Sequence, residues 1–151
     1  MSHDDLLRPT IGERVDPKVR PWRLNSQAYV AFFGGVIAAT IIAWLNSGRL
    51  GVDRGKRWLI VGTGVLGLVA VMVIYARLND EGDSEQTQTV QIVIRLVAVL
   101  CILVQMRWQR PMDRAFQLRG ADYHSMWVLG PILVVVCAIL EALLLALVVT
   151  L

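Results

Sequence analysis

Charged residues, cysteines and histidines are all scarce in this sequence of 151 residues. Charged residues make up 18% of it, below the roughly 25% of ordinary soluble domains, which argues against a cytosolic enzyme of the usual kind. Cys101 and Cys137 are too few for a disulfide scaffold and lack the spacing of metal ligands, so we expect small buried apolar side chains. His3 and His124 stand alone in polar stretches, which argues against a metal site.

Apolar residues, in contrast, make up 56% of the chain. Apart from Arg95 and Glu141, the charges lie in polar stretches that separate long apolar runs. The net charge is +3, but the basic residues flank the apolar runs instead of forming one basic face, so nucleic acid is not an expected partner. This pattern is typical of a small multi-pass membrane protein, whose first partner is the lipid bilayer.

Four apolar runs are long enough to cross a membrane. A helix rises 1.5 Å per residue and needs about 20 residues to cross a hydrocarbon core of about 30 Å. The sequence therefore predicts an all-α membrane protein, a four-transmembrane-helix bundle, in residues 27–151. A polar N-terminal tail broken by prolines, residues 1–26, precedes it. The expected spans are residues 28–45, 58–76, 90–106 and 126–148.

The large aromatic residues support these limits. Trp and Tyr side chains prefer the level of the lipid headgroups, because one part of the ring is apolar and the other polar. Trp22 lies just before the first run, and the others lie close to the ends of a run: Tyr29, Trp44, Trp58, Tyr75, Trp108, Tyr123 and Trp127.

The basic residues also predict an orientation. With four crossings, the tail, the second connection and the C-terminus share one side of the membrane and carry six Lys and Arg, against eight on the other side. Cytoplasmic loops carry the excess of basic residues, so both termini are expected outside and residues 46–57 and 107–125 in the cytoplasm. We expect the plasma (inner) membrane of a bacterium as the location.

Arg95 and Glu141 are the two charges inside the apolar runs. Such residues normally face protein or water and pair with an opposite charge. Measured from the shared end of the last two spans, Arg95 lies about 17 Å and Glu141 about 23 Å along the helix axis. A long Arg side chain covers this difference of about one helical turn. The sequence therefore predicts an intramembrane ion pair between Arg95 and Glu141.

Gln88 and Gln91 precede Arg95 at positions that place all three side chains on one face of a helix. We expect this polar stripe to face the fourth span. The ion pair has three interpretations: a structural link between the last two spans, a proton or ion relay in which Glu141 titrates, and a contact with an opposite charge on a partner subunit.

Small residues recur at the spacing of close helix contacts. Gly62, Gly64 and Gly67 also spell a dinucleotide-binding pattern, but they lie within one apolar run that has no turn or polar face, so close helix packing explains them better. The same packing is expected, within the chain or between copies, for Gly34, Gly35, Ala38 and Ala39 in the first span and for Ala138, Ala142 and Ala146 in the fourth.

No set of residues suggests a nucleophile, a base and an oxyanion donor together, so we expect no catalytic, cofactor or metal site and no enzyme activity. The leading hypothesis is a non-catalytic membrane subunit, an accessory, assembly or stabilising component of a larger complex. Its expected partners are other membrane protein subunits or further copies of itself. The alternative is a small homo-oligomeric channel, or a proton- or ion-coupled transporter, that uses the pair of Arg95 and Glu141.

Overall fold

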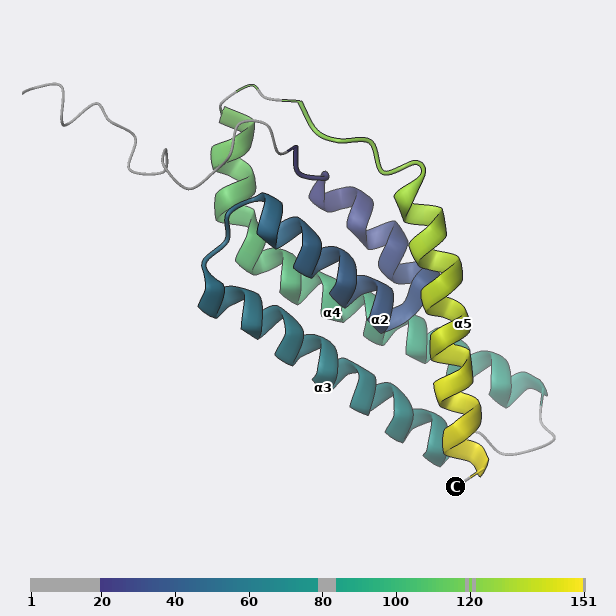
Figure 1. The fold of residues 1–151 in the computed structure, drawn as a ribbon. Coiled ribbons are helices and arrows are strands. Elements are labelled where there is room, and N and C mark those ends of the chain that lie inside the picture. Colours follow the sequence, from purple (N-terminus) through teal and green to yellow (C-terminus); the bar gives the residue numbers. More distant parts are fainter. Residues whose placement is uncertain (1–19, 79–83, 119, 121, 151) are drawn as a thin grey trace, which may run out of the picture.

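The computed structural model describes residues 20–150 except for 79–83, 119 and 121. The expected tail therefore lies mostly outside the described residues. The described chain is helical and contains no strand. Each of the four helices in it is long and apolar enough to cross a membrane. They are α2 (Leu24–Arg49), α3 (Arg54–Leu78), α4 (Ser84–Leu118) and α5 (Leu129–Thr150) (Figure 1).

The helix limits differ from the expected spans mainly at the polar ends. α4 continues well past the apolar run to Leu118, and α5 begins at Leu129, three residues after the expected start. Pro131 lies in the first turn of α5. Proline is tolerated there because the first N–H groups of a helix have no partner within the helix.

α2 is not one straight helix. At Gly35 the backbone has φ 77° and ψ −167°, a conformation that is open only to glycine, and the chain reverses direction. The Trp22 N–H donates to Asn46 Oδ1 at 2.7 Å, although 24 residues of straight helix would separate the two positions by about 36 Å. α2 is therefore a helical hairpin, with a first half-helix of residues 24–34 and a second of residues 36–49 (Figure 1).

The hairpin changes the path expected for the first apolar run. The half-helices of about 16 and 21 Å are each too short to cross a core of about 30 Å. Both ends of α2 lie at the same end of the molecule, where the Arg49 guanidinium donates to the Arg20 carbonyl. The start of α2 and the end of α5 consequently lie at opposite ends of the molecule (Figure 1).

Most basic residues gather where α2 begins and ends. The segment before α5 lies there as well, since the His124 N–H donates to the Pro21 carbonyl at 2.9 Å. Among the described basic residues outside the apolar segments, only Arg77 lies at the opposite end. We call the first end the basic end, and its described basic residues are Arg20, Arg23, Arg49, Arg54, Lys56, Arg57, Arg107, Arg110 and Arg114.

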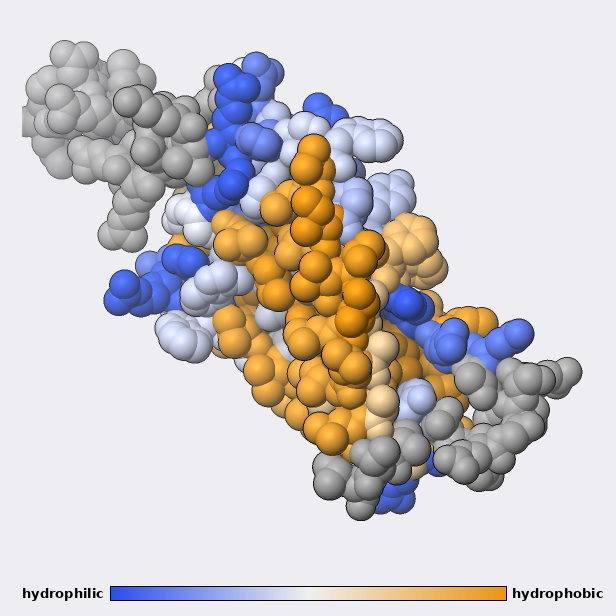
Figure 2. Space-filling model, turned by 45° about the vertical axis from the view of Figure 1, so that its right-hand side comes forward, coloured by the Kyte–Doolittle hydropathy of each residue, from blue (hydrophilic) through white to orange (hydrophobic). Residues whose placement is uncertain are grey.

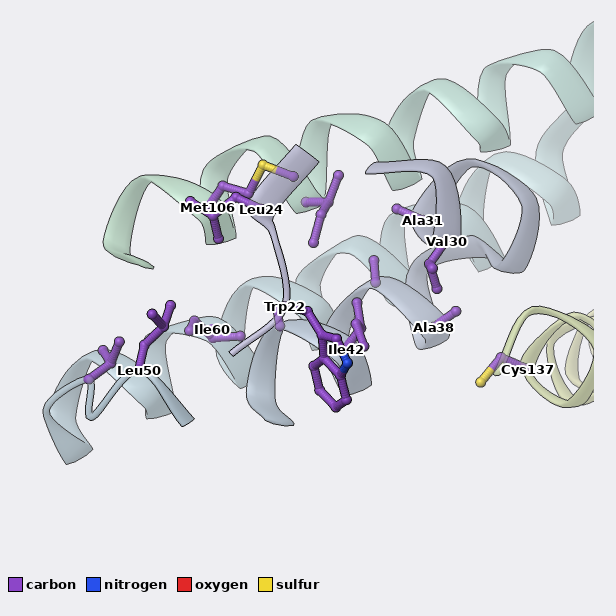
Figure 3. Close-up of a cluster of buried hydrophobic side chains, with 14 of the residues drawn as sticks. Trp22, Leu24, Val30, Ala31, Ala38, Ile42, Leu50, Ile60, Met106 and Cys137 are labelled. Carbon is purple, nitrogen blue, oxygen red and sulfur yellow. The ribbon is translucent and has the colours of Figure 1, made fainter. Parts of the chain in front are cut away.

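The α2 hairpin forms the centre of the molecule and contacts each of the other three helices. Figure 3 shows the main apolar cluster around it, with Val30 and Ile42 from its two halves, Ile60 from α3, Met106 from α4 and Cys137 from α5. In the described part of the chain, the backbones of α4 and α5 make no close contact with each other. The expectation that the polar stripe on α4 faces the fourth span is therefore not met, because α2 lies between the two helices.

The outside of the helices is strongly apolar. Leu66 on α3 is 72% exposed and Leu143 on α5 is 63% exposed, and many other large apolar side chains are similarly exposed. Figure 2 shows apolar residues over the middle of one face and hydrophilic residues toward its ends. A soluble monomer rarely exposes such a surface, so the distribution points to a membrane location.

Candidate functional site at the turn of the α2 hairpin

The turn at Gly35 leaves backbone groups without partners inside an apolar region. The last carbonyls of the first half-helix and the first N–H groups of the second have no partner within their own helix. Unsatisfied backbone groups in hydrocarbon cost several kcal/mol each, so a helix break at membrane depth needs partners from other parts of the protein.

Arg95 on α4 satisfies the end of the first half-helix. Its Nη1 donates to the Phe32 carbonyl at 3.0 Å and to the Phe33 carbonyl at 2.6 Å. The C-terminal end of a helix carries a partial negative charge, so the guanidinium is also favourably placed for electrostatic reasons.

Glu141 on α5 satisfies the start of the second half-helix. Its carboxyl group faces the backbone N–H groups of Val36 and Ile37, which favour its charge, at the helix end that carries a partial positive charge. Glu141 is only 6% exposed, and its Oε2 has no hydrogen-bond partner among the described residues. A Cβ atom at position 35 would lie 2.6 Å from Glu141 Oε1, so glycine is required there for space as well as for its backbone conformation.

Arg95 and Glu141 therefore meet at one site, on the two sides of the same turn. They attract each other electrostatically, but no direct salt bridge joins them in the described part of the chain. Each charge instead binds the backbone of α2, and the turn links them. We call this group, with Gly35 between the two charges, the turn site.

The rest of the expected polar stripe does not join the turn site. Gln88 and Gln91 are exposed on α4, on the side of Arg95 that faces away from the basic end. Their exposure and the inward position of Arg95 show that only the last member of the stripe reaches α2.

A second polar group, which the sequence analysis missed, lies between α2 and α4. The Gln105 side-chain amide donates to Thr40 Oγ1 at 3.3 Å and to the Ile60 carbonyl at 3.1 Å. One turn further along α4, Gln109 Oε1 accepts from Asn46 Nδ2 at 3.0 Å. Gln105, Gln109 and Asn46 are fully buried.

This group extends from the basic end to the turn site. Asp113, four residues after Gln109, accepts from the Tyr123 hydroxyl at 2.9 Å near the surface. At the other end of the group, the Thr40 hydroxyl donates to the carbonyl of Val36, the residue whose N–H faces the Glu141 carboxyl group. We call the series Asp113, Gln109, Asn46, Gln105 and Thr40 the polar track.

Several buried polar atoms of this region have no partner among the described residues. They are both amide atoms of Gln27, Oε1 of Gln105 and Nε2 of Gln109. Buried polar groups are normally hydrogen-bonded to protein or water, so these atoms are available to bind a water molecule or another small polar group. The spacing of Gln105, Gln109 and Asp113 by four residues was the available sequence signal, because it places all three on one helix face.

The small residues expected at helix contacts fall into two sets. Gly34, Ala38 and Ala39 are buried, and a Cβ at Gly34 would lie 3.1 Å from the Val134 Cα of α5. Gly64 lies against Thr40, and Gly67 against Cys101 and Val36. Gly62 has open space around it, Ala138 is half-buried, and Ala142 and Ala146 are exposed.

The described residues contain no group of three or more His, Cys, Asp or Glu side chains that could hold a metal ion. No protein-family model, curated protein or solved structure matches this chain. The turn site and the polar track are therefore the structural features that bear on function.

Proposed function

We propose that this chain is a small integral membrane channel or carrier that moves protons or small cations by way of Glu141. The observation that carries the proposal is a carboxyl group that is almost fully buried at a helix break and keeps one oxygen without a hydrogen-bond partner among the described residues. A buried intramembrane carboxylate is costly, and in membrane proteins it commonly marks an ion or proton pathway.

The helix break supports the same proposal. Non-helical backbone at membrane depth is tolerated where protein surrounds it or where it lines a cavity, and broken helices form the substrate sites of many transporters. Here Arg95 and Glu141 satisfy the two backbone ends. Glu141 Oε2 is then the atom that accepts a proton or a small cation, and Arg95 balances the carboxylate charge.

The polar track provides the route from the basic end. It supplies hydroxyl and amide groups from Asp113 to Thr40, and Thr40 is bound to the backbone that holds Glu141. Beyond the turn site, the exposed Gln91 and Gln88 continue along α4 toward the opposite end. Side chains that both donate and accept hydrogen bonds suit a chain of bridging waters.

The hairpin also leads us to propose an orientation. If α2 enters the membrane and returns, α3, α4 and α5 are the three crossings, and the basic end lies on one side. The positive-inside rule then places the basic end, with the start of α2, in the cytoplasm and the end of α5 outside. This orientation differs from the one expected from four crossings in the start of α2, which the hairpin brings to the same side as residues 46–57 and 107–125.

Proton flux into liposomes tests the function. The purified full-length protein is reconstituted with a pH-sensitive dye inside, and a potassium gradient with valinomycin drives the flux. We expect the native protein to acidify the vesicles and Glu141→Gln to lose that activity. Asp122→Asn, which removes an exposed carboxylate outside the apolar segments, serves as the matched control and should keep it. Absence of proton and sodium flux from the native protein would reject the proposal.

A second candidate function is that of an accessory subunit in a membrane complex. The exposed Ala142 and Ala146, with Ala138 one turn before them, favour it, because small residues on a lipid-facing helix allow close approach of another helix. Native mass spectrometry of protein purified in mild detergent from its own host separates the two. A stoichiometric foreign subunit supports the accessory function, whereas a monomer or homo-oligomer with Glu141-dependent flux supports the first proposal.

A further inference from the structure

A large groove lies between the first half-helix of α2 and the beginning of α5. Its volume is about 1060 Å³, at the upper limit of the roughly 300–1,000 Å³ of typical ligand pockets. The groove lies beside the segment that precedes α5 and is separate from the turn site, since neither Arg95 nor Glu141 lines it. The groove is therefore a separate feature from the proposed ion pathway.

One end of the groove is cationic. Arg20, Arg23 and His124 line it there, and Asp122 is the one acidic residue of the lining. Arg20 and Arg23 are exposed, and within the described part of the chain neither guanidinium forms a salt bridge with Asp122 or another carboxylate. The Arg23 guanidinium lies 5.5 Å from the centre of the Tyr123 ring. Two guanidinium groups without carboxylate partners among the described residues are suited to a phosphate group.

The rest of the groove is apolar and open to the outside of the molecule. Val30, Phe33 and Val134 line it away from the basic end, between the two helices. Phe33 is 56% exposed, so this part is continuous with the apolar outer surface of α2 and α5. Tyr29 and Trp127, which are both strongly exposed, lie on the same lining and are residue types that favour the headgroup level.

We propose that the groove binds one anionic phospholipid from the leaflet at the basic end. Its phosphate lies at Arg20 and Arg23, and an acyl chain follows Val30, Phe33 and Val134 between the first half-helix and α5. The order of cationic, aromatic and apolar residues along the groove matches the order of phosphate, glycerol and acyl chain in such a lipid. A soluble phosphate compound would use only the cationic end.

Native mass spectrometry of the full-length protein in mild detergent tests this site. The protein is offered equal amounts of phosphatidylglycerol and phosphatidylcholine with the same acyl chains. We expect preferential retention of phosphatidylglycerol. The double variant Arg20→Ala with Arg23→Ala should retain it about 30-fold less, in line with the contribution of two basic residues near a membrane surface. Ser26→Trp, which fills the groove without changing its charge, should have a similar effect.

The control is the double variant Arg54→Ala with Lys56→Ala. It removes the same charge at the basic end from residues that do not line the groove, and it should bind the lipid within about twofold of the native protein. A thermal unfolding curve confirms that each variant is folded. The proposal is overturned if both lipids are retained equally, if the control loses as much binding, or if Ser26→Trp retains phosphatidylglycerol. Displacement of the lipid by an equal concentration of glycerol phosphate would overturn it in favour of a phosphate site.

Discussion

The backbone N–H of Trp22 donates a 2.7 Å hydrogen bond to the side-chain carbonyl of Asn46, 24 positions further along the chain. This bond closes the open end of the α2 hairpin, while Gly35 forms its turn. It also explains why Trp22 is buried, although the sequence suggests a residue at the membrane boundary. The same contact places both ends of α2 at one end of the molecule.

The proposed orientation predicts the labelling of single cysteines in a background without Cys101 and Cys137. Arg77→Cys should react with a membrane-impermeant maleimide added to intact cells, because it lies at the end opposite the basic end. Arg20→Cys, Lys56→Cys and Gln117→Cys should react only after the cells are opened. Labelling of Lys56→Cys from outside would contradict the orientation, and labelling of Arg20→Cys and Lys56→Cys from opposite sides would contradict the hairpin.

Gly35→Ala should lower the stability of the protein markedly. The conformation at position 35 costs a residue other than glycine about 1–3 kcal/mol, and the added Cβ would overlap the Glu141 carboxyl group. Gly62→Ala is the matched control, because that glycine is helical and has open space around it. Alanine is favoured over glycine in a helix by about 0.5–1 kcal/mol, so this variant should be as stable as the native protein or slightly more stable. Thermal unfolding in detergent measures both.

Asn46→Ala should be destabilising because it removes two buried hydrogen bonds. The Trp22 N–H and Gln109 Oε1 would each lose a partner, at a cost of about 1–3 kcal/mol for every group left unsatisfied. Asn25→Ala, at an exposed position of the same helix, should change the midpoint of thermal unfolding little. Equal midpoints for the two variants would show that the contact between Trp22 and Asn46 does not contribute to the stability of the protein.

Arg95→Ala should destabilise the protein more than Gln91→Ala, which changes an exposed residue one turn earlier on the same helix. The change leaves two carbonyls of the first half-helix without their donor, at a cost of about 1–3 kcal/mol for every group left unsatisfied. The double variant Arg95→Ala with Glu141→Gln should lose less stability than the sum of the single changes, because both residues hold one turn. Strict additivity in thermal unfolding would argue against a shared site.

Tyr123 predicts a loss of stability at alkaline pH. Burial, followed by its hydrogen bond to Asp113, raises the pKa of the Tyr123 hydroxyl above its ordinary value. The folded state therefore retains this proton at a pH where the unfolded chain has lost it. The resulting stabilisation is complete below about pH 10, the ordinary pKa of tyrosine, and is lost as the pH rises through the raised value. Unfolding curves at several pH values should give a free energy of unfolding that falls less steeply with rising pH for Tyr123→Phe than for the native protein.

The helical elements follow largely from local sequence. Long runs without charge bury their backbone polar groups only as helices, so the four apolar segments could be predicted without tertiary information. The importance of Arg95 and Glu141 was also evident, because charges within such runs require a partner. The polar track was less evident, since Gln105 and Gln109 in isolation resemble ordinary residues near the end of a span.

The path of the first apolar segment was decided by the tertiary structure alone. Gly34 and Gly35 within that segment are compatible with close packing of a straight helix and also with a turn. The turn is stable only because Arg95 and Glu141, from two other helices, satisfy the backbone groups that it exposes. The apolar pattern of the sequence thus determined which segments are helical and apolar. Long-range partners, which no local pattern encodes, determined where one of those helices breaks and on which side of the molecule the chain continues.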